Sequence, residues 1–223
     1  MKKILIIFIV LLVALNAEEF NKTYKMKDIN VHVVNPEASL TDSIQVYYDK
    51  KTNKPINGNI HIYHGSSGYL IMDTQYYHGK RHGFSMQYDE NGKIRMKNFY
   101  KRDKFISGKG YYKTGELSYK VNEGGIKFQY YKNGKIKSIS RETKGKEHTE
   151  FYTEDGKLES EGYYINNQEH GPHKMYNSDE KLYLELVYDM GKFVLGYKYD
   201  KKGIKKKLTY RELVEMGYQY LLL

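Results

Sequence analysis

Apolar and polar residues alternate in short runs along most of this chain, and each run is interrupted by a turn-forming residue, usually glycine. Residues 83–103 (GFSMQYDENGKIRMKNFYKRD) show the pattern most clearly. Apolar side chains occupy every second position before an Asn-Gly pair and resume after it: Phe84, Met86 and Tyr88, then Ile94, Met96 and Tyr100. A period of two is typical of a β-strand with one buried face, so the segment is predicted to be a β-hairpin.

The hairpin pattern recurs six or seven times, and one turn position marks its period. Equivalent turn positions follow one another every 19 to 24 residues: Gly68, Gly92, Gly115, Gly134, Gly156, Glu180 and Gly203. Four residues earlier stands an aromatic or histidine side chain: His64, Tyr88, Tyr111, Tyr130, Tyr152, Tyr176 and Tyr199. Eleven residues later, five repeats carry a residue type that tolerates a positive φ: Gly79, Asp103, Gly145, Asn167 and Gly191. Such a period predicts stacked supersecondary units.

The alternation also predicts the loop type. With residues 90–92 as a three-residue loop, Tyr88 pairs with Ile94 and Met86 with Met96, so the apolar side chains of both strands share one face. A two-residue loop would turn Ile94 to the opposite face. The same loop is expected at residues 66–68, 113–115, 132–134, 154–156 and 201–203. Residues 123–125 predict a further tight turn, and the turn that ends at Glu180 lacks its glycine.

One hairpin buries too little apolar surface to offset the entropy of ordering it, so the repeats must stack. We therefore predict an all-β fold, an elongated, twisted, antiparallel meander of six to seven hairpin repeats, in a single domain. A lead-in at residues 18–57 comes before the array at 58–203. Strands at 29–34 and 43–48 are expected to cover its first edge.

The first residues resemble a secretory signal. Lys2 and Lys3 come before an apolar run at residues 4–15, and Ala17 stands before two glutamates. We predict a signal peptide at residues 1–17, cut after Ala17, and hence a periplasmic or secreted protein. The alternative is an uncleaved inner-membrane anchor formed by residues 4–15.

Near the C-terminus the period changes from that of a strand to that of a helix. Thr209 and Glu212 form a capping-box pattern, and an apolar face follows: Leu213, Met216, Tyr220 and Leu221. We predict that residues 204–223 contain a short helix that caps the array, with a partner-binding tail as the alternative.

Composition narrows the possible functions. The chain has 25 Tyr and 20 Gly, no Cys and no Trp, and 37 basic against 27 acidic residues, a net charge of +10. This charge would favour acidic partners or anionic lipids. However, lysines recur just after the turns, where they would line both long edges and keep the array soluble.

Patterns that would indicate catalysis or a cofactor are missing. The pairs His61/His64 and His170/His173 are three residues apart, so on a strand they face opposite sides and do not form a preset metal site. The glycines follow the hairpin period and do not form a phosphate-binding loop. Lysines beside stacked tyrosines would suit single-stranded nucleic acid, but export argues against that ligand. We expect no enzyme, no metal, no cofactor and no nucleic acid.

The repeats resemble a known family. The segment YYHGKRHG at residues 76–83, followed by Tyr88 and Asn91-Gly92, is similar to a MORN (membrane occupation and recognition nexus) repeat, in the bacterial variant found in YwqK-family antitoxins. Similar blocks occur at residues 164–171 and 188–196. The resemblance implies a β-hairpin array used for protein or lipid contact, with no catalytic residues to transfer. The tryptophan usual in eukaryotic MORN repeats is absent, which disfavours phospholipid recognition.

Together these observations predict an exported, monomeric, non-enzymatic scaffold that binds an envelope protein through a tyrosine-rich sheet face. The predicted partner-binding residues are Tyr88, Tyr111, Tyr130, Tyr152 and Tyr176. The alternative for these tyrosines is packing on Ile and Leu of their own hairpins. Alternative functions are a module for envelope polysaccharide or anionic lipid, and an antitoxin-like inhibitor of a secreted effector. The glycines at the turn positions are assigned a structural role: Gly68, Gly92, Gly115, Gly134, Gly156 and Gly203.

Overall fold

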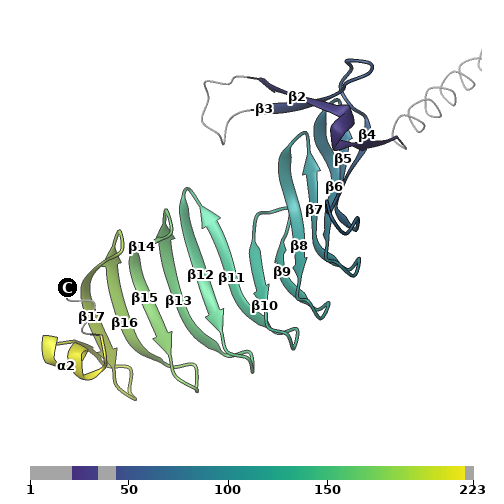
Figure 1. The fold of residues 1–223 in the computed structure, drawn as a ribbon. Helices are drawn as coiled ribbons and strands as arrows, with labels where there is room; N and C mark the ends of the chain where they lie inside the picture. The colour runs from purple at the N-terminus through teal and green to yellow at the C-terminus, as the bar shows by residue number, and fades with distance from the viewer. Residues whose placement is uncertain (1–21, 35–43, 219–223) are drawn as a thin grey trace, which may run out of the picture. The chain divides into compact units, whose positions relative to one another are not determined.

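The computed structural model describes residues 22–34 and 44–218. Almost all of this part of the chain is β-structure, built from consecutive antiparallel hairpins, and it ends in one short α-helix, α2 (Tyr210–Glu215) (Figure 1). The predicted all-β hairpin meander with a short C-terminal helix is confirmed. The chain divides into two compact units, one ending at Gly115 and the other beginning at Glu116.

The first unit contains a six-stranded sheet in the order β1-β4-β5-β6-β7-β8. Its strands are β1 (Thr23–Lys25), β4 (Gly58–Tyr63), β5 (Leu70–Tyr77), β6 (Lys80–Tyr88), β7 (Ile94–Lys101) and β8 (Lys104–Tyr111). Strand β1 pairs in parallel with β4 and so forms the first edge of this sheet. The strands expected to cover that edge, β2 (Ile29–Val34) and β3 (Ile44–Asp49), instead pair with each other in a separate two-stranded sheet.

Backbone hydrogen bonds tie β3 to the turn between β5 and β6. The Tyr47 N–H donates to the Gly79 carbonyl at 2.9 Å, and the Gly79 N–H donates to Ile56 at 2.9 Å. Gly79 has a φ of +72°, and a Cβ there would lie 2.6 Å from the Tyr47 carbonyl oxygen. Glycine is therefore required at this position both by its conformation and by the close approach of β3.

The second unit is a nine-stranded meander in the order β9-β10-β11-β12-β13-β15-β16-β17-β18, with the short β14 beside β13. Its strands are β9 (Leu117–Val121), β10 (Lys127–Tyr130), β11 (Ile136–Thr143), β12 (Lys146–Tyr152), β13 (Leu158–Ile165), β14 (Gln168–Glu169), β15 (Gly171–Tyr176), β16 (Leu182–Asp189), β17 (Lys192–Tyr199) and β18 (Lys205–Lys207). Every pairing recorded within this unit is antiparallel.

The turns follow the predicted chemistry closely. At residues 89–93, the Asp89 N–H donates to the Lys93 carbonyl at 2.9 Å and the Gly92 N–H donates to Asp89 at 3.0 Å, which defines a three-residue loop. All seven turn positions have a positive φ, including the non-glycine Glu180 at +57°. All five positions eleven residues later also have a positive φ. The loop at 66–68 was predicted wrongly: His64 pairs with Tyr69, which makes it a four-residue loop that starts at Gly65.

The pairing beyond the turns corrects a second prediction. Tyr88 pairs with Ile94 as expected, but Met96 pairs with Gln87, and Met86 pairs with Lys97. One extra residue, Arg95, forms a β-bulge just after the turn and reverses which side chains of β7 share a face with β6. The same register shift accompanies four other turn pairs: Tyr63 with Leu70, Tyr130 with Ile136, Tyr152 with Leu158 and Tyr176 with Leu182.

Side chains also link successive turns of the second unit along one edge. The Lys135 ammonium donates to the Asp155 carbonyl at 2.8 Å, and Lys157 donates to Ser178 at 2.6 Å. The Tyr131 hydroxyl donates to the Tyr152 carbonyl at 2.7 Å. Lysines predicted to line the edge therefore bind the carbonyls of the next turn.

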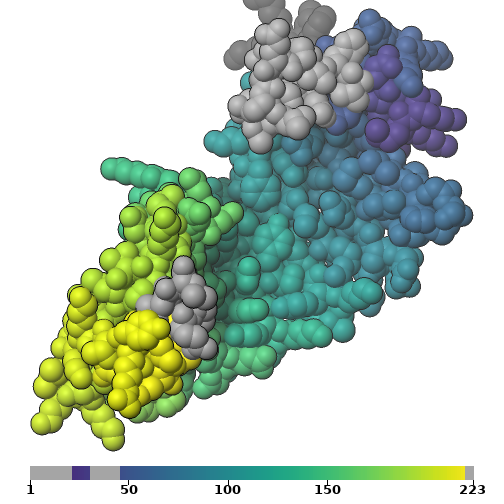
Figure 2. Space-filling view, turned by 60° about the vertical axis from the view of Figure 1, so that its left-hand side comes forward, coloured from purple at the N-terminus to yellow at the C-terminus, as the bar shows by residue number. Residues whose placement is uncertain are grey.

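Each unit has one small apolar core among its described residues. The first comprises Tyr24, Ile29, Ile56, Ile60 and Tyr76, and the second comprises Leu184, Leu186, Tyr188, Leu208 and Leu213. Leu213 comes from α2, which lies against the last strands (Figure 2). Most side chains of the other strands are only partly buried.

The capping helix has the predicted start but a shorter course. The Glu212 N–H donates to the Thr209 hydroxyl at 3.3 Å and the Glu212 carboxylate accepts from the Thr209 N–H at 2.9 Å, which confirms the capping box. The helix stops at Glu215 because Gly217 takes a φ of +82°. Met216 is therefore 40% exposed and does not extend the buried face of Leu213 as predicted. Tyr220 and Leu221 lie outside the described residues.

Candidate functional site

The five predicted partner-binding tyrosines each occupy the last position of a strand, immediately before a turn. Tyr88 ends β6, Tyr111 ends β8, Tyr130 ends β10, Tyr152 ends β12 and Tyr176 ends β15. All five are half-buried. The strand pairings place Tyr130, Tyr152 and Tyr176 on one face of the second unit, which we call the tyrosine face.

On the tyrosine face, phenol hydroxyls bind glutamates. The Tyr152 hydroxyl donates to Glu150 at 3.1 Å, and the Tyr176 hydroxyl donates to Glu161 at 2.7 Å. Burial raises the pKa of both tyrosines, and the hydrogen bonds to the carboxylates are the second cause of the increase. These two tyrosine hydroxyls are therefore engaged with the sheet itself.

Glu161 is the centre of a polar network on the same face. Its carboxylate accepts hydrogen bonds from Tyr176 and from Lys174, the latter at 3.1 Å, and lies 3.1 Å from His148 Nε2. Burial acts to raise the pKa of Glu161, but the hydrogen bonds from Tyr176, Lys174 and His148 outweigh it and hold the pKa below its ordinary value. This network orders the sheet and leaves Glu161 little capacity to bind a ligand.

In the first unit, Tyr88 has apolar neighbours. Strand alternation and pairing place Phe84, Met86, Tyr88, Ile94 and Phe99 on one face, here called the aromatic patch. The rings of Phe84 and Phe99 have centroids 5.2 Å apart, and Phe84 is 40% exposed. Lys97 Nζ lies 4.2 Å from the centroid of Phe84. The patch is an exposed apolar surface with a cation at its edge.

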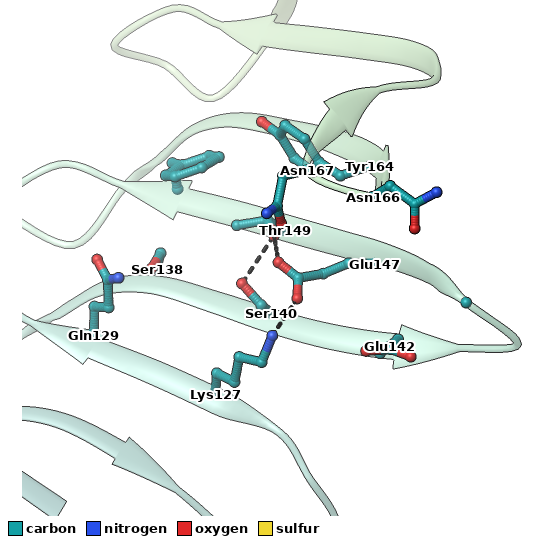
Figure 3. A pocket seen from close by; sticks show the side chains of 12 residues that line it. Lys127, Gln129, Ser138, Ser140, Glu142, Glu147, Thr149, Tyr164, Asn166 and Asn167 are labelled. Carbon is teal, nitrogen blue, oxygen red and sulfur yellow. Dashed lines mark hydrogen bonds and ion pairs between the residues drawn. The ribbon is translucent and has the colours of Figure 1, made fainter. Parts of the chain in front are cut away.

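The second unit carries a groove on the face opposite the tyrosines. Strands β10 to β13 form it, and its volume is about 500 Å³ (Figure 3). Three cross-strand rows of side chains define it. The middle row, Lys127, Ser140 and Thr149, carries mostly small side chains, so the floor of the groove lies close to the backbone. At the next position of this row, Gly162, the ring of His173 covers the backbone. The flanking rows contribute Gln129, Ser138 and Phe151 on one side and Glu142, Glu147 and Tyr164 on the other.

Hydrogen bonds hold the floor in place. Ser140 Oγ and Thr149 Oγ1 are 2.8 Å apart, and the Thr149 hydroxyl also lies 3.4 Å from Glu147 Oε1. Lys127 Nζ forms an ion pair with Glu147 Oε2 at 2.5 Å (Figure 3). Thr149 is 4% exposed. The polar side chains of the floor are thus already bonded to one another.

The rim of the groove is less well satisfied. Glu142 lies directly opposite Glu147 in the pairing of β11 with β12, and Lys127 pairs with Glu147 and not with Glu142. The side chains of Gln129, Glu142, Asn166 and Asn167 are exposed, and no hydrogen bond or ion pair is recorded for them among the described residues. These groups offer both donors and acceptors to the space above the floor.

Histidines form separate pairs with carboxylates. His61 Nε2 lies 3.3 Å from Asp73, and His173 Nδ1 lies 2.9 Å from Glu169. Within residues 22–34 and 44–218, no three metal-binding side chains of His, Asp or Glu come together. No helix in that same part of the chain is both long and apolar enough to cross a bilayer.

The groove was not foreseen from the sequence. Its side chains come from four strands, and the bulges in the pairings of β10 with β11 and of β12 with β13 decide which of them share a face. Small residues at alternate positions, Ser138 and Ser140, were the one available signal. Alternation alone could not show which neighbouring side chains they would face.

Three segments of the chain match the MORN repeat variant family: residues 81–102, 123–141 and 148–166. The first spans the hairpin of β6 and β7, and the other two lie in the second unit around the groove. The chain therefore contains MORN-type repeats, as the resemblance implied.

No curated protein matches the chain. Among solved structures, a variant of S. aureus TarM in complex with fondaparinux, alpha-GlcNAc-glycerol and UDP aligns with 20% identity over 36% of this chain and 17% of that one, with a TM-score of 0.31. A second crystal structure of TarM aligns with 17% identity over 38% and 19% of the two chains, also with a TM-score of 0.31. The chain thus spans less than a fifth of either, and a similarity this slight carries no functional argument.

Proposed function

We propose that this chain is an exported, non-enzymatic repeat protein that binds an envelope protein through the aromatic patch around Tyr88. The observation that supports this function is the exposure of large apolar side chains on one face of β6 and β7. Phe84 is 40% exposed and Ile94 is 38% exposed, and both lie on the same face as Tyr88, with Ile94 paired directly to it. Exposed clusters of apolar and aromatic side chains mark protein-binding surfaces, and aromatic residues dominate their binding energy.

The tyrosine face of the second unit supports the same function less strongly. Tyr152 and Tyr176 donate their hydroxyls to glutamates of their own sheet, so binding a partner would have to compete with those bonds. We therefore place the main contact on the aromatic patch and assign the tyrosine face a stabilising role.

The chain offers a matched pair of phenylalanines to test this proposal. Phe84 and Phe105 are 40% and 39% exposed and lie in the same unit. They are on opposite faces of the sheet. Phe105 packs beside Gly108, and the pairings Gly108–Asn98 and Asn98–Ser85 place Gly108 on the face that Phe84 does not occupy. A photocrosslinking phenylalanine analogue at either site would report what that face contacts in the native cell.

A discrete protein adduct from position 84, with little or none from position 105, would support the proposal. Equal adducts from both sites, or none from position 84, would contradict it. A Phe84→Ser variant should then lose the partner in quantitative co-purification, whereas Phe105→Ser should retain it.

Export remains a proposal because residues 1–21 lie outside the described residues. The N-terminal mass of the native protein from fractionated cells tests it. A chain that begins at Glu18 in the soluble envelope fraction would support cleavage after Ala17, and an intact Met1 in the membrane fraction would support the anchor.

The antitoxin-like alternative rests on the likeness to YwqK-family repeats alone. It predicts a neighbouring gene for a toxic enzyme, whose purified product the full chain should inhibit at equimolar concentration.

A further inference from the structure

We propose that the groove across β10 to β13 is a binding site for an uncharged oligosaccharide. This site is separate from the aromatic patch and lies entirely in the second unit. Its volume, about 500 Å³, falls in the usual range of ligand pockets. The four strands span about 14 Å at roughly 4.8 Å per strand, so the groove is wide enough for an extended chain of sugar rings.

The charges of the groove argue against an anionic ligand. The whole chain carries a net charge of +10, but the groove is lined by one lysine and two glutamates. The ammonium of Lys127 is already neutralised by Glu147 at 2.5 Å. The carboxylate that remains, Glu142, would repel a phosphate or an acidic headgroup. The groove therefore lacks the positive charge that the chain carries as a whole.

The uncommitted polar groups suit hydroxyls. A sugar hydroxyl is both a donor and an acceptor, so it is best matched by side chains that offer both functions or that alternate around it. Gln129, Asn166 and Asn167 each present an amide with two donors and an acceptor, and Glu142 adds two acceptor oxygens. Gln129 lies on one side of the hydrogen-bonded floor, and Glu142, Asn166 and Asn167 lie toward the other, so these four groups border the groove from both sides (Figure 3).

Apolar contact is available as well. The rings of Phe151 and Tyr164 line the groove beside the small side chains of the floor. Burial, with Glu169 and Glu147 nearby, raises the pKa of the Tyr164 phenol, so this ring stays neutral in the physiological range. A sugar ring has an apolar C–H face and polar hydroxyl groups at its edge. An aromatic ring beside amides and a carboxylate can contact both.

An extended peptide fits the site less well. Strands β11 and β12 are paired on both sides, so their backbone groups are not available to a further strand. Only side chains can recognise the occupant of this groove, and most of them are polar. Peptide binding at exposed sheet edges would leave the groove untouched.

The test uses the full-length purified chain and a panel of neutral glycans: chitohexaose, cellohexaose, maltohexaose and laminarihexaose. Polygalacturonate and phosphatidylglycerol vesicles serve as anionic probes. Affinities are measured by calorimetry, and the site is mapped from amide chemical shifts by NMR.

Two groove variants and one control make the outcome specific. Gln129→Ala removes a rim amide and should weaken binding of the best neutral glycan about 10-fold. Ser140→Phe places a ring on the floor and should abolish binding. The control is Gln87→Ala, because Gln87 precedes Tyr88 as Gln129 precedes Tyr130, and both are exposed. Gln87→Ala should leave the affinity unchanged.

The proposal would be supported if a neutral glycan binds, shifts the amide signals of β10 to β13, and binds more weakly to Gln129→Ala, not at all to Ser140→Phe and unchanged to Gln87→Ala. It would be overturned by binding of the anionic probes alone or by no binding of any neutral glycan. It would also be overturned if a correctly folded Ser140→Phe variant retained full affinity. Folding of each variant is checked by its circular dichroism spectrum and melting temperature. Crosslinking at Phe84 is independent of this result, so the two proposals can fail separately.

Discussion

Glu180 is the residue whose replacement most directly tests the turn geometry of this fold. It occupies a position where six other repeats have glycine, and its φ is +57°. A left-handed conformation costs a residue with a side chain about 1–2 kcal/mol relative to glycine. The side chain compensates, because its Oε1 accepts a hydrogen bond from the Leu158 N–H at 3.0 Å. We expect that bond to contribute about 1 kcal/mol.

Three substitutions separate these two effects. Glu180→Ala loses the hydrogen bond and keeps the strained backbone, so it should lower the free energy of unfolding by about 1 kcal/mol. Glu180→Gly loses the same bond but relieves the strain, so it should be about 1 kcal/mol more stable than the alanine variant. Glu180→Gln keeps an acceptor oxygen and should stay close to the unmodified protein. Gly156→Ala is the matched control, because Gly156 has a φ of +94° and only one side-chain atom, at 3.8 Å, near an added Cβ.

Urea unfolding followed by circular dichroism measures the stabilities, and amide hydrogen exchange of Leu158 reports the hydrogen bond directly. Exchange at Leu158 should accelerate in the alanine and glycine variants and stay slow in the glutamine variant. An alanine variant at least as stable as the glycine variant would show that residue 180 is not left-handed in solution. Unchanged exchange at Leu158 in all three variants would show that the side chain makes no such bond.

Three further perturbations test other parts of the structure. Gly79→Ala should destabilise the protein by about 2–4 kcal/mol in urea unfolding, because the added Cβ would meet a carbonyl of β3. The control, Gly145→Ala, has a φ of +77° and open space around the added Cβ, so it should cost only about 1–2 kcal/mol. Equal losses would argue against docking of β3 at this turn. The hydrogen bond from Lys198, together with the helix cap, lowers the pKa of Glu212 from 4.5 to about 2. Because the pKa of Glu212 is lower in the folded protein, its stabilisation of α2 is complete above pH 4.5 and should be lost as the pH falls toward 2. Amide hydrogen exchange of α2 measures this loss, and its pH dependence should be flatter in a Glu212→Gln variant. Leu213→Ala should cost about 2–5 kcal/mol by urea unfolding, since this side chain is 4% exposed in the second core, and a loss under 1 kcal/mol would contradict that packing.

The repeat pattern was sufficient to predict the hairpins, the positions of the turns and the three-residue loop at most of them. Each of these depends on a few neighbouring residues, because a turn that needs a positive φ selects glycine, asparagine or aspartate locally. Even Glu180 was correctly aligned with the glycines by the spacing of Tyr176 and Leu182 around it. The four-residue loop at His64 was missed because Gly65 and Gly68 allow two different closures.

The candidate sites were less predictable. The sequence pattern placed the tyrosines on the incoming strands but did not identify the glutamates that they bind: Glu150 lies on the same strand as Tyr152, and Glu161 lies on the strand beside Tyr176. Glu161, for example, binds Tyr176 and Lys174 from the next strand of the sheet, β15. Contacts of this kind depend on register across strands that are connected by loops of variable length.

The sequence by itself therefore determined the secondary structure of this protein and its repeat period, because both are recorded in the alternation of side chains and the conformational needs of the turns. The tertiary structure alone decided which side chains share a face. A single bulged residue after the turn at Gly92 changes the parity of the outgoing strand, and that change moved Met96 away from Met86. Ser140 and Thr149 meet through regular pairing, and shifts beside Tyr130 and Tyr152 set which side chains of β10 and β13 lie next to them.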